Sequence, residues 1–292
     1  MQLRPSAAGL ALAGVLGTMA AAWGAGQEPD QRPGAAGWLP KLETPLPTLG
    51  GKQFWTDELF FHQWRIQRNA RSGEFRLLDA DNLQHASGGY VECRAKLEEI
   101  KRTQHLAPMK GKVVIVLHGL FRSRSSMNKL ARHLEEKGGY TVLKMSYAST
   151  QRDVAAHARA LDRIVSRLGG VEQISFVGHS LGNIVVRRYL HDQAHRAGGR
   201  PPERRIRRFV MLAPPNHGSV VAAALADSAL GSAVTGKTGR ELGVAWEKLE
   251  ARLGTPPCQF GIIAGGLGNE HGLNPFIPGD DDGTVTAAST RL

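Results

Sequence analysis

Cysteine is scarce in this chain, which has only Cys93 and Cys258 among its 292 residues. Two cysteines exclude a small disulfide-stabilised scaffold and a cysteine-rich zinc fold. Long apolar runs are also lacking: none reaches the roughly 18–20 residues of a convincing membrane span, with one weak candidate at the N-terminus. Hydrophobic residues nevertheless make up 41 % and charged residues 22 %, so a core can form and global disorder is excluded.

Acidic residues are the other shortage. The chain has 26 Asp and Glu against 37 Lys and Arg, a net charge of +11. Such a surplus favours anionic partners such as nucleic acid or phospholipid head groups, and is equally compatible with an ordinary solvated surface.

The first 25 residues have the order of an export signal. A short basic start at Met1–Arg4 precedes an apolar stretch at Ala7–Ala22 that ends in small residues. This order predicts a signal peptide over residues 1–25 and an exported protein, whether periplasmic, extracellular or membrane-associated. The alternatives are an uncleaved anchor and a segment that is neither signal nor anchor. Export would permit a disulfide between Cys93 and Cys258, although two unpaired thiols fit the sequence as well.

Residues 26–52 are rich in Pro and Gly and predict a linker or an arm laid over the surface. The remaining residues, 53–292, form the predicted folded domain. Its first apolar runs, at 60–66 and 75–78, flank a turn sequence at 69–73 and predict an antiparallel strand pair. A helix is expected over 91–103.

A strand–helix alternation follows. Apolar runs predict strands at 112–117, 140–147, 174–177, 208–212 and 259–264. Helical spacing predicts helices over 126–137 and after Thr150, with Thr150 as the N-cap. This alternation predicts the α/β class, with a doubly wound mostly parallel sheet whose active site lies at the carboxyl ends of the strands.

The chemistry-bearing motif is Gly178-His179-Ser180-Leu181-Gly182, which directly follows the strand at 174–177 and precedes a helix. G-x-S-x-G in this context predicts a nucleophile elbow, a sharp turn that holds the Ser180 hydroxyl above the sheet. The glycines are needed because side chains there would clash with the neighbouring strand and helix. The alternative is a glycine-rich strand–helix turn that has no catalytic role.

His118-Gly119-Leu120 ends the strand at 112–117. The loop after this strand commonly donates one N–H to the oxyanion, and the residue after the nucleophile donates the other. We therefore expect the backbone amides of Leu120 and Leu181 to form the oxyanion hole. We expect His118 to order its loop rather than to act as the base.

These two motifs and Ala213-Pro214-Pro215-Asn216-His217-Gly218-Ser219 together resemble the α/β-hydrolase superfamily, and most closely its bacterial triacylglycerol-lipase-like esterases. The likeness extends from about Lys110 to the C-terminus. It implies hydrolysis of carboxylic esters, often lipidic, by a Ser-Asp-His triad without a cofactor or metal. The family pattern D-G-x-V places the acid at Asp282, with Asp280 or Asp281 as alternatives; a solvated turn or a calcium site is also open.

The triad histidine is missing where the resemblance places it, because the ten residues after Asp282 contain no His. The expected last strand and helix are missing as well. Three explanations stay open: a truncated chain, a substitute base at His271 or His217, or a non-catalytic relative that binds esters or a partner. Loss of a triad member costs several orders of magnitude in rate.

Two further segments bear on the substrate. Residues 220–253 lie where a lipase-like enzyme carries a cap, and an ordinary packed helix is equally compatible. Arginines crowd residues 187–208, which suits either a solvated surface or peripheral contact with an anionic membrane. We expect a small-molecule or lipid ester as substrate and no nucleic-acid partner, because no recognised module accompanies the charge.

Overall fold

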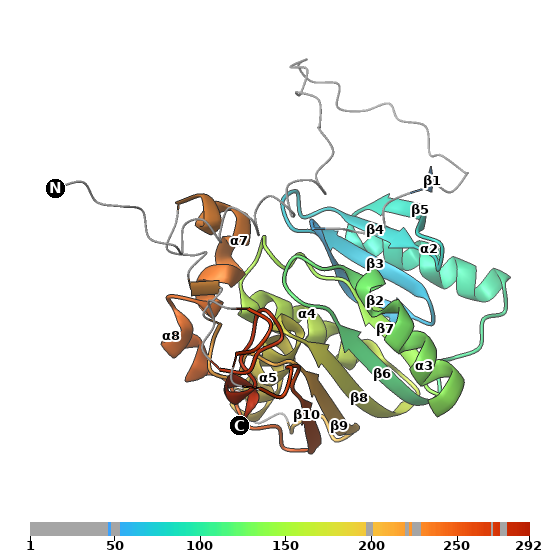
Figure 1. Cartoon of the computed structure of the whole chain (residues 1–292). Helices are drawn as coiled ribbons and strands as arrows, with labels where there is room; N and C mark the ends of the chain where they lie inside the picture. The colour runs from blue at the N-terminus through green and yellow to red at the C-terminus, as the bar shows by residue number, and fades with distance from the viewer. Residues whose placement is uncertain are drawn as a thin grey trace, which may run out of the picture. The chain divides into compact units, whose positions relative to one another are not determined.

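The computed structural model describes residues 46–47, 53–196, 201–219, 222–223, 229–269, 271–274 and 279–292. The expected signal peptide and nearly all of the expected arm lie outside these residues. The described part belongs to one compact unit, Thr44–Leu292, and holds two five-stranded sheets (Figure 1).

The larger half is a parallel sheet in the order β10-β9-β8-β6-β7. Its strands are β6 (Gly111–Leu117), β7 (Thr141–Met145), β8 (Val171–His179), β9 (Ile206–Leu212) and β10 (Gln259–Ile263). Every neighbouring pair is parallel. The predicted doubly wound α/β sheet is therefore confirmed.

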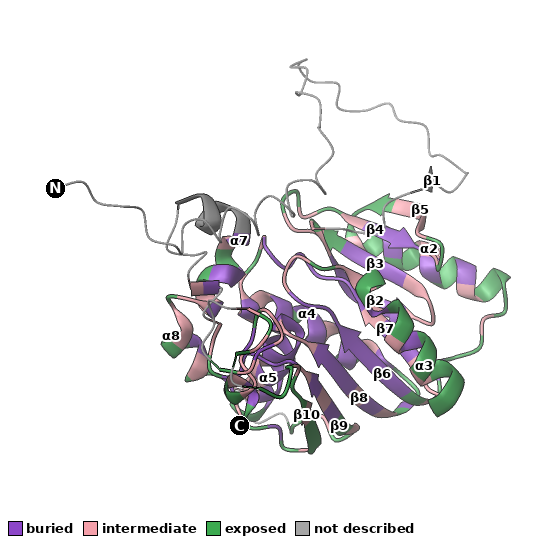
Figure 2. Ribbon diagram, viewed as in Figure 1, coloured by how far each residue is buried: buried purple, intermediate pink, exposed green. Residues whose placement is uncertain are grey.

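Alternate side chains of β6 serve two separate cores. Val113, Ile115 and Leu117 pack with helices α4 (Val154–Arg167) and α5 (Leu181–Ala194), whereas Val114 and Val116 face α3 (Asn128–Gly138). From Val113 on, β6 is buried on both faces and is purple in Figure 2, whereas the edge strand β10 is largely exposed and green. A strand buried on both faces must be apolar throughout, which explains why its sequence shows no alternation.

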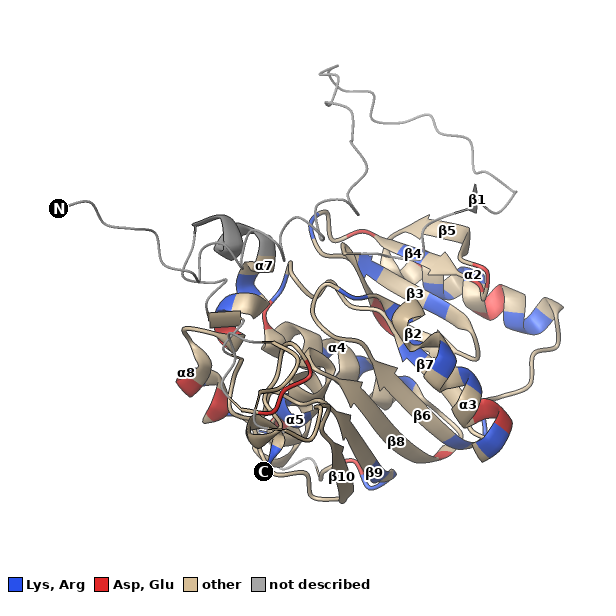
Figure 3. Ribbon diagram, viewed as in Figure 1, with Lys and Arg blue, Asp and Glu red and all other residues tan. Residues whose placement is uncertain are grey.

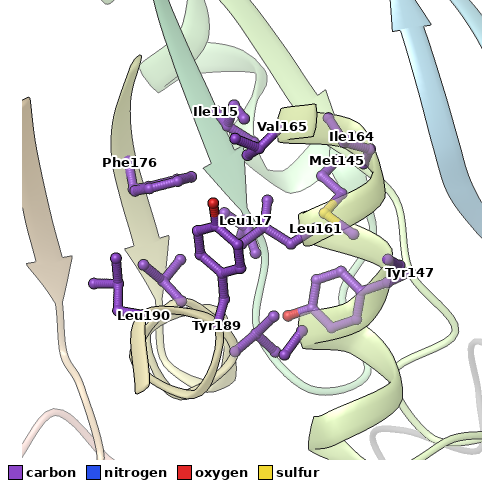
Figure 4. Close-up of a cluster of buried hydrophobic side chains, with 14 of the residues drawn as sticks. Ile115, Leu117, Met145, Tyr147, Leu161, Ile164, Val165, Phe176, Tyr189 and Leu190 are labelled. Atoms are coloured by element: carbon purple, nitrogen blue, oxygen red, sulfur yellow. The ribbon is translucent and has the colours of Figure 1, made fainter. Parts of the chain in front are cut away.

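The main core lies between the parallel sheet, α4 and α5 (Figure 4). Phe176 of β8 meets Tyr189 and Phe209 edge-on, at ring centroid distances of 5.9 and 6.3 Å. This core anchors the strand that carries the G-x-S-x-G motif. The site above it therefore rests on a rigid support.

The smaller half is an antiparallel sheet in the order β1-β5-β4-β3-β2. Its strands are β1 (Leu46–Pro47), β2 (Trp55–Phe61), β3 (Trp64–Asn69), β4 (Phe75–Leu78) and β5 (Leu83–Gly88), and helix α2 (Tyr90–Thr103) packs on it. The expected strand pair is therefore part of a larger sheet. The expected run at 60–66 is not one strand: it contains the β2–β3 turn, where His62 takes a left-handed φ of 50°.

Helix α4 begins one residue after Asp153, whose Oδ1 accepts a hydrogen bond from the backbone N–H of Ala156 at 2.6 Å. Asp153 rather than Thr150 is thus the N-cap, and the expectation for Thr150 is wrong. Either residue can cap a helix, and only the position of the first turn decides between them.

The order of strands brings two loops together. The chain runs from β6 outward to β7 and then returns to β8 on the other side of β6. The ends of β6 and β8 are level, because Leu117 pairs with Gly178. This is the topological switch point, where open α/β sheets bind their ligands.

Beyond β10, the described residues hold one short helix, η2 (Ala288–Thr290), and an isolated bridge between Asp281 and Thr286. Both cysteines are free: Cys93 is buried in the antiparallel half and Cys258 is half-buried beside the main core. Within the described ranges, no helix is long and apolar enough to cross a membrane.

Candidate active site

Ser180 occupies the tip of the turn between β8 and α5, with φ 51° and ψ −120°. A non-glycine residue in this region costs roughly 1–3 kcal/mol and persists only when its surroundings fix it. Here the Ser180 N–H donates to the carbonyl of Leu212 at 3.0 Å, and its carbonyl accepts from the N–H of Asn183 at 3.0 Å. The strain is held by the end of β9 on one side and by the first turn of α5 on the other.

The flanking glycines are required by space. A Cβ on Gly178 would lie 2.4 Å from Oδ1 of Asn183, and a Cβ on Gly182 would lie 2.6 Å from the carbonyl oxygen of Leu117. Real Cβ atoms do not approach so closely, and the Leu117 contact is with backbone that cannot turn aside. The physical reason given for the glycines of the motif is thus confirmed.

Asn183 is a residue that the sequence analysis missed. It is fully buried in the first turn of α5, and its Nδ2 donates to the carbonyls of Ser180 at 3.0 Å and Leu212 at 2.9 Å. The side chain therefore ties the turn to β9. A polar residue among the apolar residues 184–186 was the available signal, because a buried amide must find partners.

The loop after β6 lies against the turn. A Cβ on Gly119 would come within 3.2 Å of the Ser180 Cβ and 3.0 Å of Nδ1 of His179, so the main chain of the loop approaches the turn closely at this glycine. Leu120 follows Gly119 and is half-buried against the main core. Leu181 is the first residue of α5, where a backbone N–H has no carbonyl partner within the helix. The two expected oxyanion donors thus lie in the two segments that meet here, and their role stays a prediction.

His118 is buried at the base of this loop. Its Nδ1 lies 2.9 Å from the carbonyl oxygen of Gly119, and its ring stacks on Tyr147 at 4.2 Å with a 9° angle between the planes. The Tyr147 hydroxyl donates to the carbonyl of His118. Burial lowers the pKa of His118 to about 4, so the ring is neutral near pH 7. These contacts are those of a residue that orders the loop.

Asp282 lies in the segment after β10, and its Oδ1 accepts from the N–H groups of Thr284 at 3.0 Å and Val285 at 2.8 Å. Burial, followed by the charge of Arg122, lowers the pKa of His179, and the charge of Asp282 opposes this shift. The predicted acid thus acts electrostatically on the residue that precedes Ser180, and its role in a triad stays a prediction.

The other two aspartates hold the loop together. Asp281 is fully buried and accepts from the N–H of Gly283 at 2.6 Å and of Asn274 at 3.1 Å. Asp280 accepts from the N–H groups of Leu267 at 2.7 Å and Gly268 at 3.1 Å. Each of these two carboxylates therefore accepts hydrogen bonds from a different part of the loop backbone.

The two substitute bases lie at the surface. His217 is exposed, and its Nδ1 lies 3.2 Å from Oε1 of Glu250 in α8 (Trp246–Glu250). His271 is exposed too, and its backbone N–H donates to Asn269 at 2.9 Å. In the part of the chain that the structure describes, no hydrogen bond joins either imidazole to Ser180 or Asp282. Among the described residues, neither histidine is therefore hydrogen-bonded to the serine, and the role of both stays a prediction.

The expected cap at 220–253 is described in part, including α7 (Ala229–Leu242). The Thr238 hydroxyl donates to the carbonyl of Arg152 at 2.6 Å, and Glu241 accepts from the N–H of Val154 at 2.7 Å. These contacts pack the end of α7 against the start of α4. A mobile lid stays an expectation for this segment.

Several arginines of residues 187–208 are engaged within the fold. The buried Arg187 donates to Asn216 Oδ1 at 3.0 Å and to the Gly254 carbonyl at 3.1 Å. Arg188 pairs with Asp192 at 2.8 Å, and Arg205 pairs with Glu203 at 2.7 Å. Much of the local positive charge is therefore used in holding the molecule together.

Comparison with known proteins gives a family match over residues 108–252, to the family described as "Putative serine esterase (DUF676)". No curated protein matches the chain. Among solved structures, the mature form of the Bacillus licheniformis lipase BlEst2 is 23 % identical at a TM-score of 0.46, over 65 % of this chain and 82 % of that one.

Two further solved structures are similar. Phospholipase PlaB from Legionella pneumophila, in complex with thio-NAD, is 21 % identical at a TM-score of 0.47, over 62 % of this chain and 44 % of its own. This chain thus spans less than half the length of that phospholipase. The product of the gene lin2722 from Listeria innocua is 18 % identical at a TM-score of 0.41, over 63 % of this chain and 77 % of that one.

Proposed function

We propose that the chain, which matches the DUF676 serine esterase family over residues 108–252, cleaves carboxylic esters through an acyl-enzyme on Ser180. The observation that carries the proposal is the backbone of Ser180. Its φ of 51° is held between two glycines that nothing larger can replace, with the Gly119 loop against it. Such strain at a strand–helix turn is typical of a nucleophile position.

In the proposed reaction, the Ser180 oxygen attacks the ester carbonyl carbon while an imidazole takes the hydroxyl proton. The negative charge that develops on the carbonyl oxygen is stabilised by the N–H groups of Leu120 and Leu181. The alcohol leaves with the proton, and the acyl group stays on Ser180 until water, deprotonated in the same way, releases the acid. Asp282 orients the imidazole and stabilises its cationic form.

A fluorophosphonate probe tests the nucleophile directly, because it phosphonylates only an activated serine. We expect the wild-type chain to be labelled and Ser180→Ala not to be labelled. Ser175→Ala is the matched control, since Ser175 lies on the same strand outside the turn. Circular dichroism of each variant checks that it is folded, and labelling of Ser180→Ala equal to wild type would contradict the proposal.

The base is tested separately. If His217 or His271 supplies the proton acceptor, replacing that histidine with Ala lowers the labelling rate by several orders of magnitude, while the other replacement has little effect. Unchanged labelling in both variants would exclude both histidines. The pH profile of labelling then reports the pKa of whichever group acts.

A second candidate function is an ester- or partner-binding module on the same fold. It is favoured by the absence, among the described residues, of a histidine hydrogen-bonded to Ser180. The folded wild-type chain would then bind a non-hydrolysable ester analogue without being labelled by the probe. Labelling at Ser180 would exclude this candidate.

The substrate and the cellular location belong to the same proposal. A lipidic ester is favoured by the lipase-like motifs, and export by the order of charge and apolar residues in 1–25. N-terminal sequencing of the protein from its native host tests the cleavage near residue 25. Co-sedimentation with anionic and neutral vesicles tests peripheral membrane contact, and equal binding to both would contradict a role for the arginines.

A further inference from the structure

A polar cavity of about 360 Å³ lies where the loop after β6 meets the antiparallel sheet. Most of its wall comes from three parts of the chain: the segment 122–128, the end of β7 with the residues after it, and Asn82 just before β5. Its volume falls in the ordinary range for sites that bind small molecules. Apart from Ala80 and the ring of Tyr147, the described lining is polar, so the cavity does not suit an acyl chain.

The charged side chains that line the cavity are all cationic. Arg122, Arg124 and Lys144 line it, and no Asp or Glu is among its described lining residues. His118 also lines it but is neutral, because burial lowers its pKa to about 4. The basic positions of the neighbouring strands are blue in Figure 3.

A further cation, Arg65, does not line the cavity itself but is bonded to a residue that does. Arg65 of β3 is fully buried, and its Nη2 donates to Oδ1 of Asn82, which faces the cavity. Asn82 Oδ1 also accepts from Arg124 Nη1 at 3.4 Å. One side-chain oxygen therefore holds two guanidinium groups side by side.

The buried carboxylate near these cations, Asp57, already accepts hydrogen bonds from other groups. Asp57 is fully buried, but its Oδ1 accepts from Gln67 Nε2 at 2.8 Å and its Oδ2 from the Ser146 N–H at 2.6 Å. Its distance to Arg65 Nη1 is 3.7 Å, too long for a hydrogen bond. Asp57 offsets part of the charge and leaves guanidinium donors unused.

Those unused donors are buried. Nε and Nη1 of Arg65 and Nε of Arg124 are shielded from solvent and have no hydrogen-bond partner. A buried donor without a partner costs roughly 1–3 kcal/mol, more for a charged group. Burial, followed by the neighbouring Arg65, lowers the pKa of Arg124 to about 10, and burial and Arg124 lower the pKa of Lys144. The cations thus repel one another, and an anion bound in the cavity would offset that repulsion.

We propose that this cavity binds the phosphate group of a small anionic ligand. Three lining cations without a carboxylate suit a dianion better than a monoanion, and guanidinium groups match the geometry of phosphate oxygens. The site is separate from the chemistry at Ser180 but adjacent to it, because His118 and Arg122 flank the Gly119 turn that lies against Ser180. The inference goes beyond the proposed esterase activity and does not depend on it.

The test uses the full chain with Ser180→Ala, so that binding is measured without turnover. Thermal unfolding and isothermal titration are recorded with inorganic phosphate and glycerol 3-phosphate, and with chloride at equal ionic strength. We expect both phosphate compounds to raise the melting temperature saturably and chloride to leave it nearly unchanged. Stabilisation by chloride equal to that by phosphate would overturn the proposal.

Substitutions identify the site. Arg124→Gln and Lys144→Gln are each expected to weaken phosphate binding by about tenfold or more, since each removes a charge-assisted hydrogen bond. Arg132→Gln, at an exposed position of α3, is the matched control and should bind as before. Without ligand, Arg124→Gln should unfold at the same or a higher temperature, because it removes a crowded cation; a merely structural arginine would show the opposite. Equal phosphate affinity in Arg124→Gln and Arg132→Gln would overturn the proposal.

The source of the phosphate is decided by a second arm with vesicles that contain phosphatidic acid. Vesicle binding that is lost in Arg124→Gln identifies a lipid head group. Binding of glycerol 3-phosphate without vesicle binding identifies a soluble phosphate ester. Either result supports a phosphate site, and failure of all three probes to bind would reject it. Fluorophosphonate labelling is read independently, so this proposal and the esterase proposal can fail separately.

Discussion

The two sheets have the same number of strands but bury different chemistry. β6 of the parallel sheet is apolar along its buried length, from Val113 to Leu117. The antiparallel sheet instead buries Asp57, Arg65, Gln67 and Arg76. Burying a strand on both faces leaves no room for solvated groups, whereas a polar network can be buried only if its members satisfy one another. The parallel half is held by packing, and the antiparallel half depends in addition on paired charges.

The polar network of the antiparallel sheet is connected from end to end. Gln67 accepts from Arg76 Nε at 3.1 Å and donates to Asp57 at 2.8 Å, while the Arg76 guanidinium lies 3.9 Å above the Trp55 ring. Asp57 then reaches Ser146, just beyond β7, through the backbone N–H. The network therefore links the two sheets, and its unsatisfied end is the cavity beside Arg65 and Arg124.

Truncation of the apolar core should have the largest effect on stability. Phe176→Ala removes a fully buried ring from β8 and should lower the free energy of unfolding by about 3–5 kcal/mol. Chemical denaturation measures it, with Phe260→Ala as the control, because Phe260 lies in the same sheet but is 41 % exposed. Equal losses in the two variants would show that burial does not govern the parallel half.

Removal of the buried carboxylate should cost nearly as much. Asp57→Ala removes the buried carboxylate that pairs with Arg65 and should destabilise the fold by about 3–5 kcal/mol. The exposed Asp81→Ala is the control, measured by the same denaturation. Adding Arg65→Met to Asp57→Ala should restore part of the loss, since it removes the uncompensated charge. No restoration would mean that packing, and not charge pairing, dominates this half.

Acid should act on the parallel half through two buried histidines. Burial lowers the pKa of His118 to about 4 and that of His157 to about 3, so the native state binds fewer protons than the unfolded chain below pH 6.5. Their stabilising contribution is complete above about pH 6.5 and decreases as the pH falls toward those values, by up to about 1.4 kcal/mol per pH unit for each histidine. Denaturation between pH 7 and pH 5 measures the slope. His157→Gln should flatten it, whereas the exposed His133→Gln should not.

The N-cap of α4 should give the smallest effect. Asp153→Ala removes the acceptor for the Ala156 N–H and should cost about 1 kcal/mol. Asp153→Asn keeps the acceptor and should unfold within a few tenths of a kcal/mol of wild type. A loss in Asp153→Ala as large as that in Asp57→Ala would remove the distinction between a local polar contact and a buried charge pair.

The sequence predicted the parallel half better than the antiparallel half, and the comparison explains why. Continuous β-branched runs such as Val113–Leu117 have few alternatives to a buried strand. In contrast, residues 60–66 read as one apolar run although His62 turns the chain within it, and the buried Arg65 carries a charge that favours an exposed position. Tertiary partners override local preference wherever polar groups are buried.

The same division holds in the candidate site. The turn at Ser180 was predictable because glycines at fixed spacing between a strand and a helix have a steric cause within a few residues. The role of Asn183 was not, because its carbonyl partners include Leu212, 29 residues away. Nor could spacing place His217 beside Glu250, since that contact is made by the segment between β9 and β10.

By itself, the sequence determined the strand–helix alternation and the sharp turn at Ser180, because each follows from local residue order. Only the tertiary structure decided that Asn183 would tie the turn to β9, and that Arg65, Arg124 and Lys144 would gather around one cavity. The physical reason is that charge and close contact depend on distance in space, and distance is set by how the two sheets pack.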